Sequence, residues 1–342
     1  MRTEEEPGNR RIWRSLVAGA AGVGLVVAAV ACTDSAAPNP PASSTTEATV
    51  PDESTSTTST TEAVPGPLAD QTPPSSTFGI DFHKNQLWVV DFYKGEIVVV
   101  DPDSGTILRR VKSEDNVSDE VDNISVDKDG ILYWVGYNDG AVGQVIVGGN
   151  VGRVFGRVQS GLGGVAISAD AKTLYVGGSM TGPAPLYALD PLSQDQPEPI
   201  IASLDIRAFA VAPDGMLYGP RWGSTASGAR PGGLVQVDPA TATATELVGG
   251  LDGPIAAAIS PDGTKVFVLS QPNGKPPALQ SIDLATREVT AMPSPATPLV
   301  ANLTVAPDGR IFVTSYNTND ISIIGKDGTV RTLAIGQPPR EK

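Results

Sequence analysis

Few side chains in this sequence could act as a nucleophile or a general base. The 342 residues include one histidine, His83, and one cysteine, Cys32. A Ser–His–Asp triad would have to use His83, and the sequence contains no Gly-x-Ser-x-Gly motif. A single cysteine also leaves no disulfide framework and no Cys-rich zinc site. We therefore predict no catalytic residues and no metal ligands.

A second set of residues could bind a ligand. Arg207, Arg221 and Trp222 suit an anionic or sugar-like ligand, because guanidinium groups make charge-assisted hydrogen bonds and an indole ring stacks. Each residue of this set has an alternative interpretation as a solvated loop side chain. The full set of candidate ligand-binding residues is Asp91, Asp122, Asn123, Arg207, Arg221, Trp222, Asn302 and Tyr316.

The elements that must position these residues form a repeat. An apolar strand is followed by a turn of Pro-Asp-Gly type and then by a strand with an aromatic residue at a fixed place, as in "FAVAPDGMLYGP". A period of about 40–50 residues with four strands per unit is typical of a β-propeller. We therefore predict an all-β fold, a six-bladed β-propeller with four-stranded blades, over residues 77–342. The repeated aromatic residues are Trp88, Tyr133, Tyr175, Tyr218, Phe267 and Phe312.

The turns indicate which end of the propeller carries the candidate site. Turns at Pro213, Pro261 and Pro307 join the first and second strands of their blades. The loops between the second and third strands lie at the opposite end, and we expect the ligand face there. Counting five and six residues back from the turn gives a ring at that face, Thr77–Phe78, Asp122–Asn123, Gly163–Gly164, Arg207–Ala208, Ile255–Ala256 and Ala301–Asn302.

The segments "SPDGTKVFV" and "APDGRIFVTSYNTNDISII" resemble those of the senescence marker protein/gluconolactonase family and of the related NHL-type and surface-layer propellers. For the lactonases of that family, the resemblance implies a divalent metal held by a Glu, an Asn and an Asp. In that family the Asn and the Asp lie six residues before the Pro-Asp-Gly turn of their blades. At the equivalent positions of this sequence, only Asp122 matches by residue type. A hard cation with too few oxygen ligands is not held tightly, so we predict no cofactor.

The N-terminal residues 1–31 have the composition of an export signal. Three arginines between residues 10 and 14 precede an uncharged run over 15–31, shorter than the ~20 residues that a spanning helix needs. The end of this run, "AVAC", resembles the bacterial lipobox, which implies a lipid on Cys32. We predict a lipoprotein signal peptide over 1–31. The alternatives are an ordinary secretory signal and a short transmembrane anchor with an incidental cysteine.

Residues 32–76 are dominated by Ser, Thr, Pro and Ala and have too few large apolar groups to form a core. Residues 33–76 carry six acidic side chains and no basic one. We predict a disordered acidic stalk, anchored at Cys32, that lifts the propeller off the membrane. We expect the stalk to be dispensable for folding.

The formal net charge is −14 and the chain has no basic stripe, which excludes nucleic-acid binding through the phosphates. We predict a monomeric lipoprotein, extracytoplasmic and lipid-anchored to the cell membrane of a bacterium. Its propeller binds a small molecule or an envelope protein, without catalysis. The alternative is a metal-dependent hydrolase or lactonase of the gluconolactonase type with a rearranged site, which would require a divalent cation. A third interpretation is a structural envelope module.

Overall fold

The computed structural model describes residues 66–113, 120–146, 148–193, 195–226 and 229–336. These residues form strands throughout, and the 3-10 turn Phe92–Lys94 is the one helical element among them. The predicted all-β class is therefore confirmed. Within this part of the chain no helix is long and apolar enough to cross a membrane. The predicted signal peptide, Cys32 and residues 33–65 of the predicted stalk lie outside the described residues.

The strands follow one another in antiparallel meanders of four. The first is β1 (Thr77–His83), β2 (Gln86–Asp91), β3 (Glu96–Val100) and β4 (Ile107–Ser113), and the second is β5 (Val121–Val126), β6 (Leu132–Gly136), β7 (Ala141–Val145) and β8 (Val151–Arg157). These two meanders form one eight-stranded sheet, because β4 pairs with β8 in parallel. The third is β9 (Leu162–Ile167), β10 (Leu174–Ser179), β11 (Ala184–Leu189) and β12 (Pro199–Leu204).

The later meanders are separate four-stranded sheets, as is the third. The fourth is β13 (Ala210–Val211), β14 (Leu217–Arg221), β15 (Gly232–Asp238) and β16 (Thr243–Leu251). The fifth is β17 (Pro254–Ile259), β18 (Lys265–Ser270), β19 (Ala278–Asp283) and β20 (Val289–Met292). The sixth is β21 (Val300–Val305), β22 (Ile311–Ser315), β23 (Asp320–Ile324) and β24 (Val330–Ala334).

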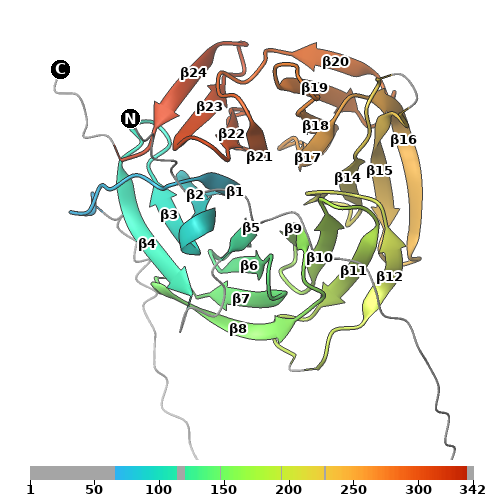
Figure 1. Ribbon diagram of the computed structural model, residues 1–342. Coiled ribbons are helices and arrows are strands. Elements are labelled where there is room, and N and C mark those ends of the chain that lie inside the picture. Colours follow the sequence, from blue (N-terminus) through green and yellow to red (C-terminus); the bar gives the residue numbers. More distant parts are fainter. Residues whose placement is uncertain (1–65, 114–119, 147, 194, 227–228, 337–342) are drawn as a thin grey trace, which may run out of the picture. The chain divides into compact units, whose positions relative to one another are not determined.

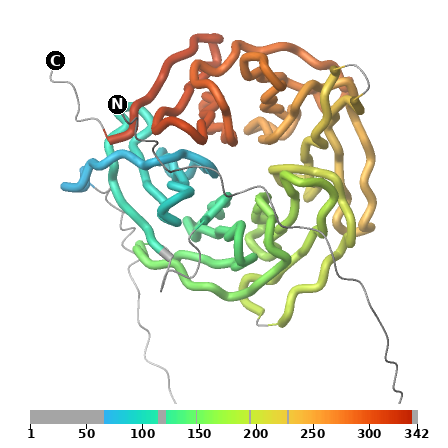
Figure 2. Tube along the Cα trace, in the orientation of Figure 1, coloured from blue at the N-terminus to red at the C-terminus, as the bar shows by residue number. Residues whose placement is uncertain are grey.

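The first strands of the meanders form a closed ring around a common axis (Figure 1; the chain trace in Figure 2 follows the same circle). Strand β1 contacts both β5 and β21, β9 contacts β5 and β13, and β17 contacts β13 and β21. The first strands are therefore the inner strands of the domain. Five of the apolar clusters each combine residues of two successive meanders. One further cluster joins the first meander to the sixth. The core thus lies between the sheets and continues across the junction of the two chain ends.

The predicted turns are confirmed. The side-chain oxygens of Asp214, Asp262 and Asp308 each accept a hydrogen bond from the backbone N–H two residues later. The glycines that follow these aspartates have positive φ, at 86°, 71° and 88°, a backbone conformation that glycine adopts without steric cost. Because the strands alternate in direction, these turns lie at one end of the ring, which we call the turn face. The loops between second and third strands lie at the other end, the loop face.

Cross-strand pairing corrects the predicted ring of loop-face residues in the first meander. Each repeated aromatic pairs with one inner-strand residue, and these partners are Asp81, Ser125, Ala166, Ala210, Ala258 and Thr304. Three residues before Asp81 is Phe78, so Phe78–Gly79 is equivalent to Asp122–Asn123, and the assignment of Thr77–Phe78 was one residue too early. The first meander has no Pro-Asp-Gly turn, and the count therefore lacked its reference residue there.

Contacts of the folded domain begin before residue 77. The Leu68 N–H donates to Ile107 O at 2.8 Å, and Leu68 packs against the cluster between the first and sixth meanders. The Gln71 amide donates to Ile107 O and accepts from Ile107 N, both at 2.9 Å. The sequence analysis expects the stalk to be dispensable for folding up to residue 76. Leu68 and Gln71, near its end, nevertheless form hydrogen bonds with the first residue of β4.

Candidate ligand-binding site

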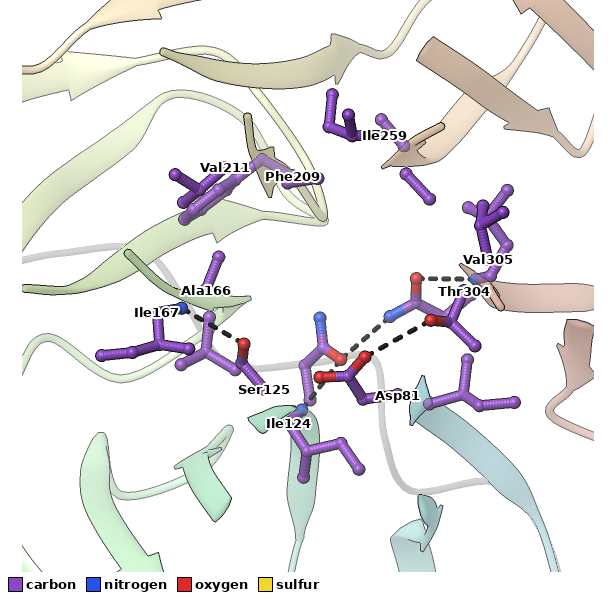
Figure 3. A pocket seen from close by; sticks show the side chains of 18 residues that line it. Asp81, Ile124, Ser125, Ala166, Ile167, Phe209, Val211, Ile259, Thr304 and Val305 are labelled. Carbon is purple, nitrogen blue, oxygen red and sulfur yellow. Dashed lines mark hydrogen bonds between the residues drawn. The ribbon is translucent and has the colours of Figure 1, made fainter. Parts of the chain in front are cut away.

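A cavity of about 230 Å³ occupies the middle of the ring, and every inner strand contributes to its wall. Figure 3 shows its side chains around one open space. Successive side chains of a β-strand point to opposite faces of the sheet, so part of each inner strand faces the cavity. The ring of inner strands leaves open space along its axis. Small residues at many wall positions, such as Ala166, Ala257 and Ala258, keep the space open. The fold therefore supplies a central site to which all six inner strands contribute.

The wall of this cavity has a polar half and an apolar half. At the inner-strand position that pairs with the repeated aromatic, β1, β5 and β21 carry Asp81, Ser125 and Thr304. The same position on β9, β13 and β17 is alanine. Phe209, Val211 and Ile259 add larger apolar side chains to the alanine half, while Asn123 and Asn302 add amides to the other. The first, second and sixth meanders therefore form the polar half.

Asp81 is the charged residue of the polar half. Its carboxylate accepts hydrogen bonds from Val126 N at 2.6 Å, Phe82 N at 2.7 Å and Thr304 Oγ1 at 3.3 Å. These partners come from three meanders, so Asp81 connects the inner strands on both of its sides. Figure 3 shows its contact with Thr304. Burial raises the pKa of Asp81 to about 6, although the three hydrogen bonds act in the opposite direction. The sequence analysis did not select this residue.

Asn123 and Asn302 meet across the ring junction, as their common register predicts. The Asn302 Nδ2 donates to Asn123 Oδ1 at 3.0 Å, and each side-chain oxygen accepts the N–H of the following residue. Asn123 is 5% exposed and lines the cavity. Among the described residues, none accepts a hydrogen bond from Asn123 Nδ2. Its two N–H donors are therefore available to a molecule in the cavity.

Asp122 lies at the loop-face entrance, one residue before Asn123. It is 8% exposed, and its carboxylate has no hydrogen-bond partner among the described residues. The neighbouring inner strand leaves room for it only because residue 163 is glycine, since a Cβ there would lie 2.7 Å from Asp122 Oδ2. Burial, assisted by the charge of Glu120, raises the pKa of Asp122 to about 7. Asp122 can therefore gain or lose a proton near neutral pH.

Arg207 and Trp222 lie together at the loop face. The guanidinium is 5.7 Å from the centre of the indole ring and donates hydrogen bonds to the Met180 side chain and carbonyl. Burial lowers the pKa of Arg207, and Trp222 remains 41% exposed. The charges of Arg207 and Asp122 both act on the pKa of Tyr137. Arg207 and Asp122 therefore both lie near Tyr137.

Two candidate residues make structural contacts away from the cavity. Arg221 is 6% exposed and forms an ion pair with Glu246 at 2.8 Å, and it also donates to Pro231 O at 2.9 Å. Glu246 belongs to the outer strand β16, so Arg221 points outward along its own sheet. The predicted arginine pair is therefore not formed. Asp91 is fully buried and accepts a hydrogen bond from Ser75 N at 3.0 Å, which holds the N-terminal segment.

Tyr316, the remaining candidate, is a partly exposed residue that follows β22. It is 38% exposed and lies 6.1 Å from the Phe78 ring, measured between centroids. Its backbone carbonyl accepts a hydrogen bond from Ser76 Oγ at 2.7 Å. This contact joins the first and sixth meanders and does not reach the residues that line the cavity.

The sequence analysis missed the residues nearest the middle of the cavity. Asp81, Ser125 and Thr304 lie three residues before the turn position, whereas the candidates were taken from five and six residues before it. A polar residue in a strand that otherwise carries Val, Ile or Ala is the signal that could have found them. Glu120 was also outside the candidate set, because its contribution depends on loop conformation.

No cluster of three or more His, Cys, Asp or Glu side chains that could hold a metal occurs in the residues that the structure describes. His83 ends β1 at the turn face, at the opposite end of the ring from Asp122 and Arg207. A divalent cation in the channel would have Asp81 as its one carboxylate among the cavity-lining residues.

No protein-family model matches the sequence, and no curated protein sequence does. Solved structures are similar to this chain. Virginiamycin B lyase from Staphylococcus aureus has a TM-score of 0.55 at 10% identity, covering 78% of this chain and 86% of that one. A nidogen/laminin complex has a TM-score of 0.57 at 12% identity, covering 71% of this chain and 91% of that one. Hydrazine synthase from Kuenenia stuttgartiensis has a TM-score of 0.54 at 17% identity, covering 76% of this chain and 79% of that one.

These identities are low enough that the similarity concerns the fold alone. The similar structures are β-propeller proteins with different activities, and the ring of antiparallel meanders agrees with them. A shared propeller does not imply a shared site or reaction. The chain has a β-propeller fold.

Proposed function

We propose that this protein is an extracytoplasmic lipoprotein whose propeller binds a small ligand in its central channel, without catalysis. Each meander is one blade, which gives six blades, the first two of them joined by the pairing of β4 with β8. One observation carries the proposal: a central cavity of about 230 Å³, lined by all six inner strands, faces the unpartnered amide donors of Asn123. Ligand sites are typically enclosed, largely apolar spaces with a few convergent polar groups.

The absence of catalysis is proposed from the groups that surround this cavity. Its lining contains one carboxylate and no histidine, lysine, cysteine or tyrosine. Acid–base and nucleophilic catalysis both need a second, correctly placed group. Asp81 is already engaged by three hydrogen-bond donors, and Asp122 lies at the entrance and not in the lining. A binding protein needs no more than these groups supply.

A variant that fills the channel tests the proposal. Ala258 lies in the cavity wall on β17, and Ala258→Phe places a ring in the space. A thermal-shift screen of soluble small molecules should find compounds that stabilise the wild type and not this variant. Saturation at about 100 times Kd stabilises by roughly 2.7 kcal/mol. Ala285→Phe, in an exposed turn, is the matched control. Stabilisation that survives Ala258→Phe would place the site elsewhere.

The proposed anchor is the lipid on Cys32, after cleavage of residues 1–31. Its support is the sequence alone: an uncharged run that ends in the single cysteine of the chain. Cys32→Ser should move the protein from the membrane fraction to the soluble fraction. Thr33→Ser, a change at the next residue that leaves the thiol in place, is the matched control and should remain with the membrane. Full membrane association of Cys32→Ser would contradict the proposal.

A metal-dependent hydrolase of the gluconolactonase type remains the alternative, and Asp122 is the observation that favours it. Its buried carboxylate has no partner among the described residues and could ligate a cation at the channel entrance. The amount of divalent metal in the purified protein separates the two functions. One equivalent of metal, lost in Asp122→Asn, would favour the hydrolase. A metal-free protein that still binds a ligand in the channel would favour the binding protein.

A further inference from the structure

We propose that the channel takes a small organic ammonium ion that also carries a hydrogen-bond acceptor, with its charge at Asp81 and its carbon skeleton against Phe209. The proposal rests on the proposed function and names the ligand class of the same cavity. The two halves of the channel wall are its basis. In Figure 3, Asp81 and Phe209 lie on different sides of the open space.

The charge in the cavity lining is negative and uncompensated. Asp81 is the one ionisable group among the lining residues, which include no lysine, arginine or histidine. Asp122 adds a second enclosed carboxylate at the loop-face entrance. Arg207, on the same face, is held by Met180 and Trp222. A carboxylate enclosed in protein without a cation is costly, and a bound cation offsets that cost.

Asp81 has hydrogen-bonding capacity left for a ligand. A carboxylate has about four lone-pair sites. Two donors, Phe82 N and Thr304 Oγ1, bond to Oδ1, and one, Val126 N, bonds to Oδ2. An ammonium N–H can therefore bond to Oδ2 without displacing a contact that connects the blades. The free amide N–H groups of Asn123 require an acceptor, and a hydroxyl on the ligand provides one.

The apolar half favours an organic cation over a metal ion. Phe209, Val211 and Ile259 offer carbon surface to the cavity, and a hard cation needs six or more oxygen ligands. An alkylammonium ion needs one carboxylate and gains from contact with apolar and aromatic carbon. At ~30 Å³ per water molecule, the cavity of about 230 Å³ has the volume of about eight waters, which is room for a single substituted ring.

The test uses 4-aminocyclohexanol and its neutral counterpart cyclohexane-1,4-diol, each titrated into the wild-type protein by calorimetry at pH 7.5. These two compounds have nearly the same shape and differ in the ammonium group. We expect the amine to bind at least tenfold more tightly than the diol. Equal binding of the two, or no binding of the amine, would overturn the proposed ligand class.

Asp81→Ser isolates the charge. Ser125 occupies the equivalent position on β5, where its hydroxyl accepts the N–H of Ile167 at 3.2 Å. A serine at 81 can therefore accept the Val126 N–H in the same way, and the variant should fold. It should bind the amine at least tenfold more weakly. Asp81→Asn is the second neutral variant in case serine destabilises the domain. Unchanged affinity in either folded variant would overturn the proposal.

Two further variants separate this proposal from the proposed function. Phe209→Leu removes the aromatic surface against the shared carbon skeleton, so it should weaken the binding of both compounds several-fold. Ala258→Phe should abolish binding of both compounds. If the diol binds to the wild type as tightly as the amine and Ala258→Phe abolishes both, the ammonium class fails and the channel site stands. Amine binding that persists in Ala258→Phe contradicts the channel site itself.

Discussion

The polar and apolar halves of the channel wall hold the ring together in different ways. On the polar half, side chains bridge neighbouring inner strands: Asp81 accepts from Val126 N, Ser125 accepts from Ile167 N, and Asn302 donates to Asn123. On the apolar half, the backbones meet directly. Ala208 and Ala256 form an isolated parallel bridge, and Ala257 N donates to Ala208 O at 3.2 Å.

The size of the inner-strand residues explains this difference. Alanine lets two backbones approach until an N–H reaches a carbonyl, whereas aspartate and threonine connect strands by their own polar atoms. Where β1 meets β22, the junction of the first and last meanders uses the second method. Thr77 Oγ1 donates to Ser315 O at 2.8 Å and accepts from Ser315 N at 3.1 Å, and Thr314 donates to Phe78 O. Closure of the ring therefore depends on hydroxyl groups.

The largest effect should come from the closest approach on the polar half. A Cβ at Gly79 would lie 2.6 Å from Asn123 Cα and 2.8 Å from Asp122 O. Gly79→Ala must separate β1 from β5, and we expect a loss of about 3 kcal/mol in the free energy of unfolding. Urea denaturation measures it. Gly66→Ala, with no atom within 4 Å of the added carbon, should have no effect. Equal stability of the two variants would mean that the polar half tolerates separation.

Removal of one hydroxyl at the junction should have the next largest effect. Thr77 is fully buried, and Thr77→Val leaves both backbone groups of Ser315 without this partner. We expect a loss of about 2 kcal/mol, again by urea denaturation. The reciprocal change, Ala210→Thr, adds a hydroxyl to the apolar half where the cavity offers space, and should change stability by less than about 0.5 kcal/mol. Similar losses would remove the distinction between the halves.

The N-terminal segment should contribute less than the junction that it covers. Removing residues 33–65 should leave the melting temperature unchanged. A chain that starts at Pro73 also loses Leu68 and Gln71, and should be less stable by about 1–2 kcal/mol, since three hydrogen bonds with Ile107 disappear. Thermal unfolding compares the two truncations. Gln71→Ala in the longer chain should reproduce part of the loss; identical melting of all three would show that the segment contributes nothing.

The smallest effect depends on pH and concerns the entrance of the channel. Burial raises the folded-state pKa of Asp122 to about 7, above the 3.8 of an unperturbed aspartate. Protonated Asp122 therefore contributes to the free energy of unfolding. This contribution is fully present below about pH 4 and is lost as the pH rises towards 7. Asp122→Asn removes this loss, so it should raise the melting temperature by ~2–4 °C at pH 8, as about 1 kcal/mol would in a domain of this size. At pH 4 the difference should disappear, and a constant difference would contradict the raised pKa.

The sequence predicted the regular parts of this molecule well. The repeated aromatics and the Pro-Asp-Gly turns report local chemistry, namely packing between sheets and positive φ, and both occur where expected. The loop-face placement of Asp122, Asn123, Arg207 and Asn302 followed from the same register. The register failed at Thr77 and Phe78, where the turn residues that define it are missing.

The roles of single side chains were harder to predict, because they depend on neighbours distant in sequence. Arg221 on β14 pairs with Glu246 on β16, across the intervening strand β15, and no spacing in the sequence indicates that contact. Asp81 acquires its importance from Val126 and Thr304, which belong to other meanders. A repeat thus shows which positions face the axis, while the partner of each polar group follows only from the closed ring.

The contacts near the chain ends make the described domain almost cyclic. Gly336 N donates to Gly105 O at 2.9 Å, and a Cβ at Gly336 would lie 2.2 Å from Gln71 O. A short peptide could therefore join residue 336 to the segment around Gln71, and new termini could be opened between β20 and β21. Such a circular permutant would carry the ring junction within a continuous polypeptide. The original seam would then be covalent, and the hydroxyl contacts that close it would become ordinary contacts between neighbours in the chain.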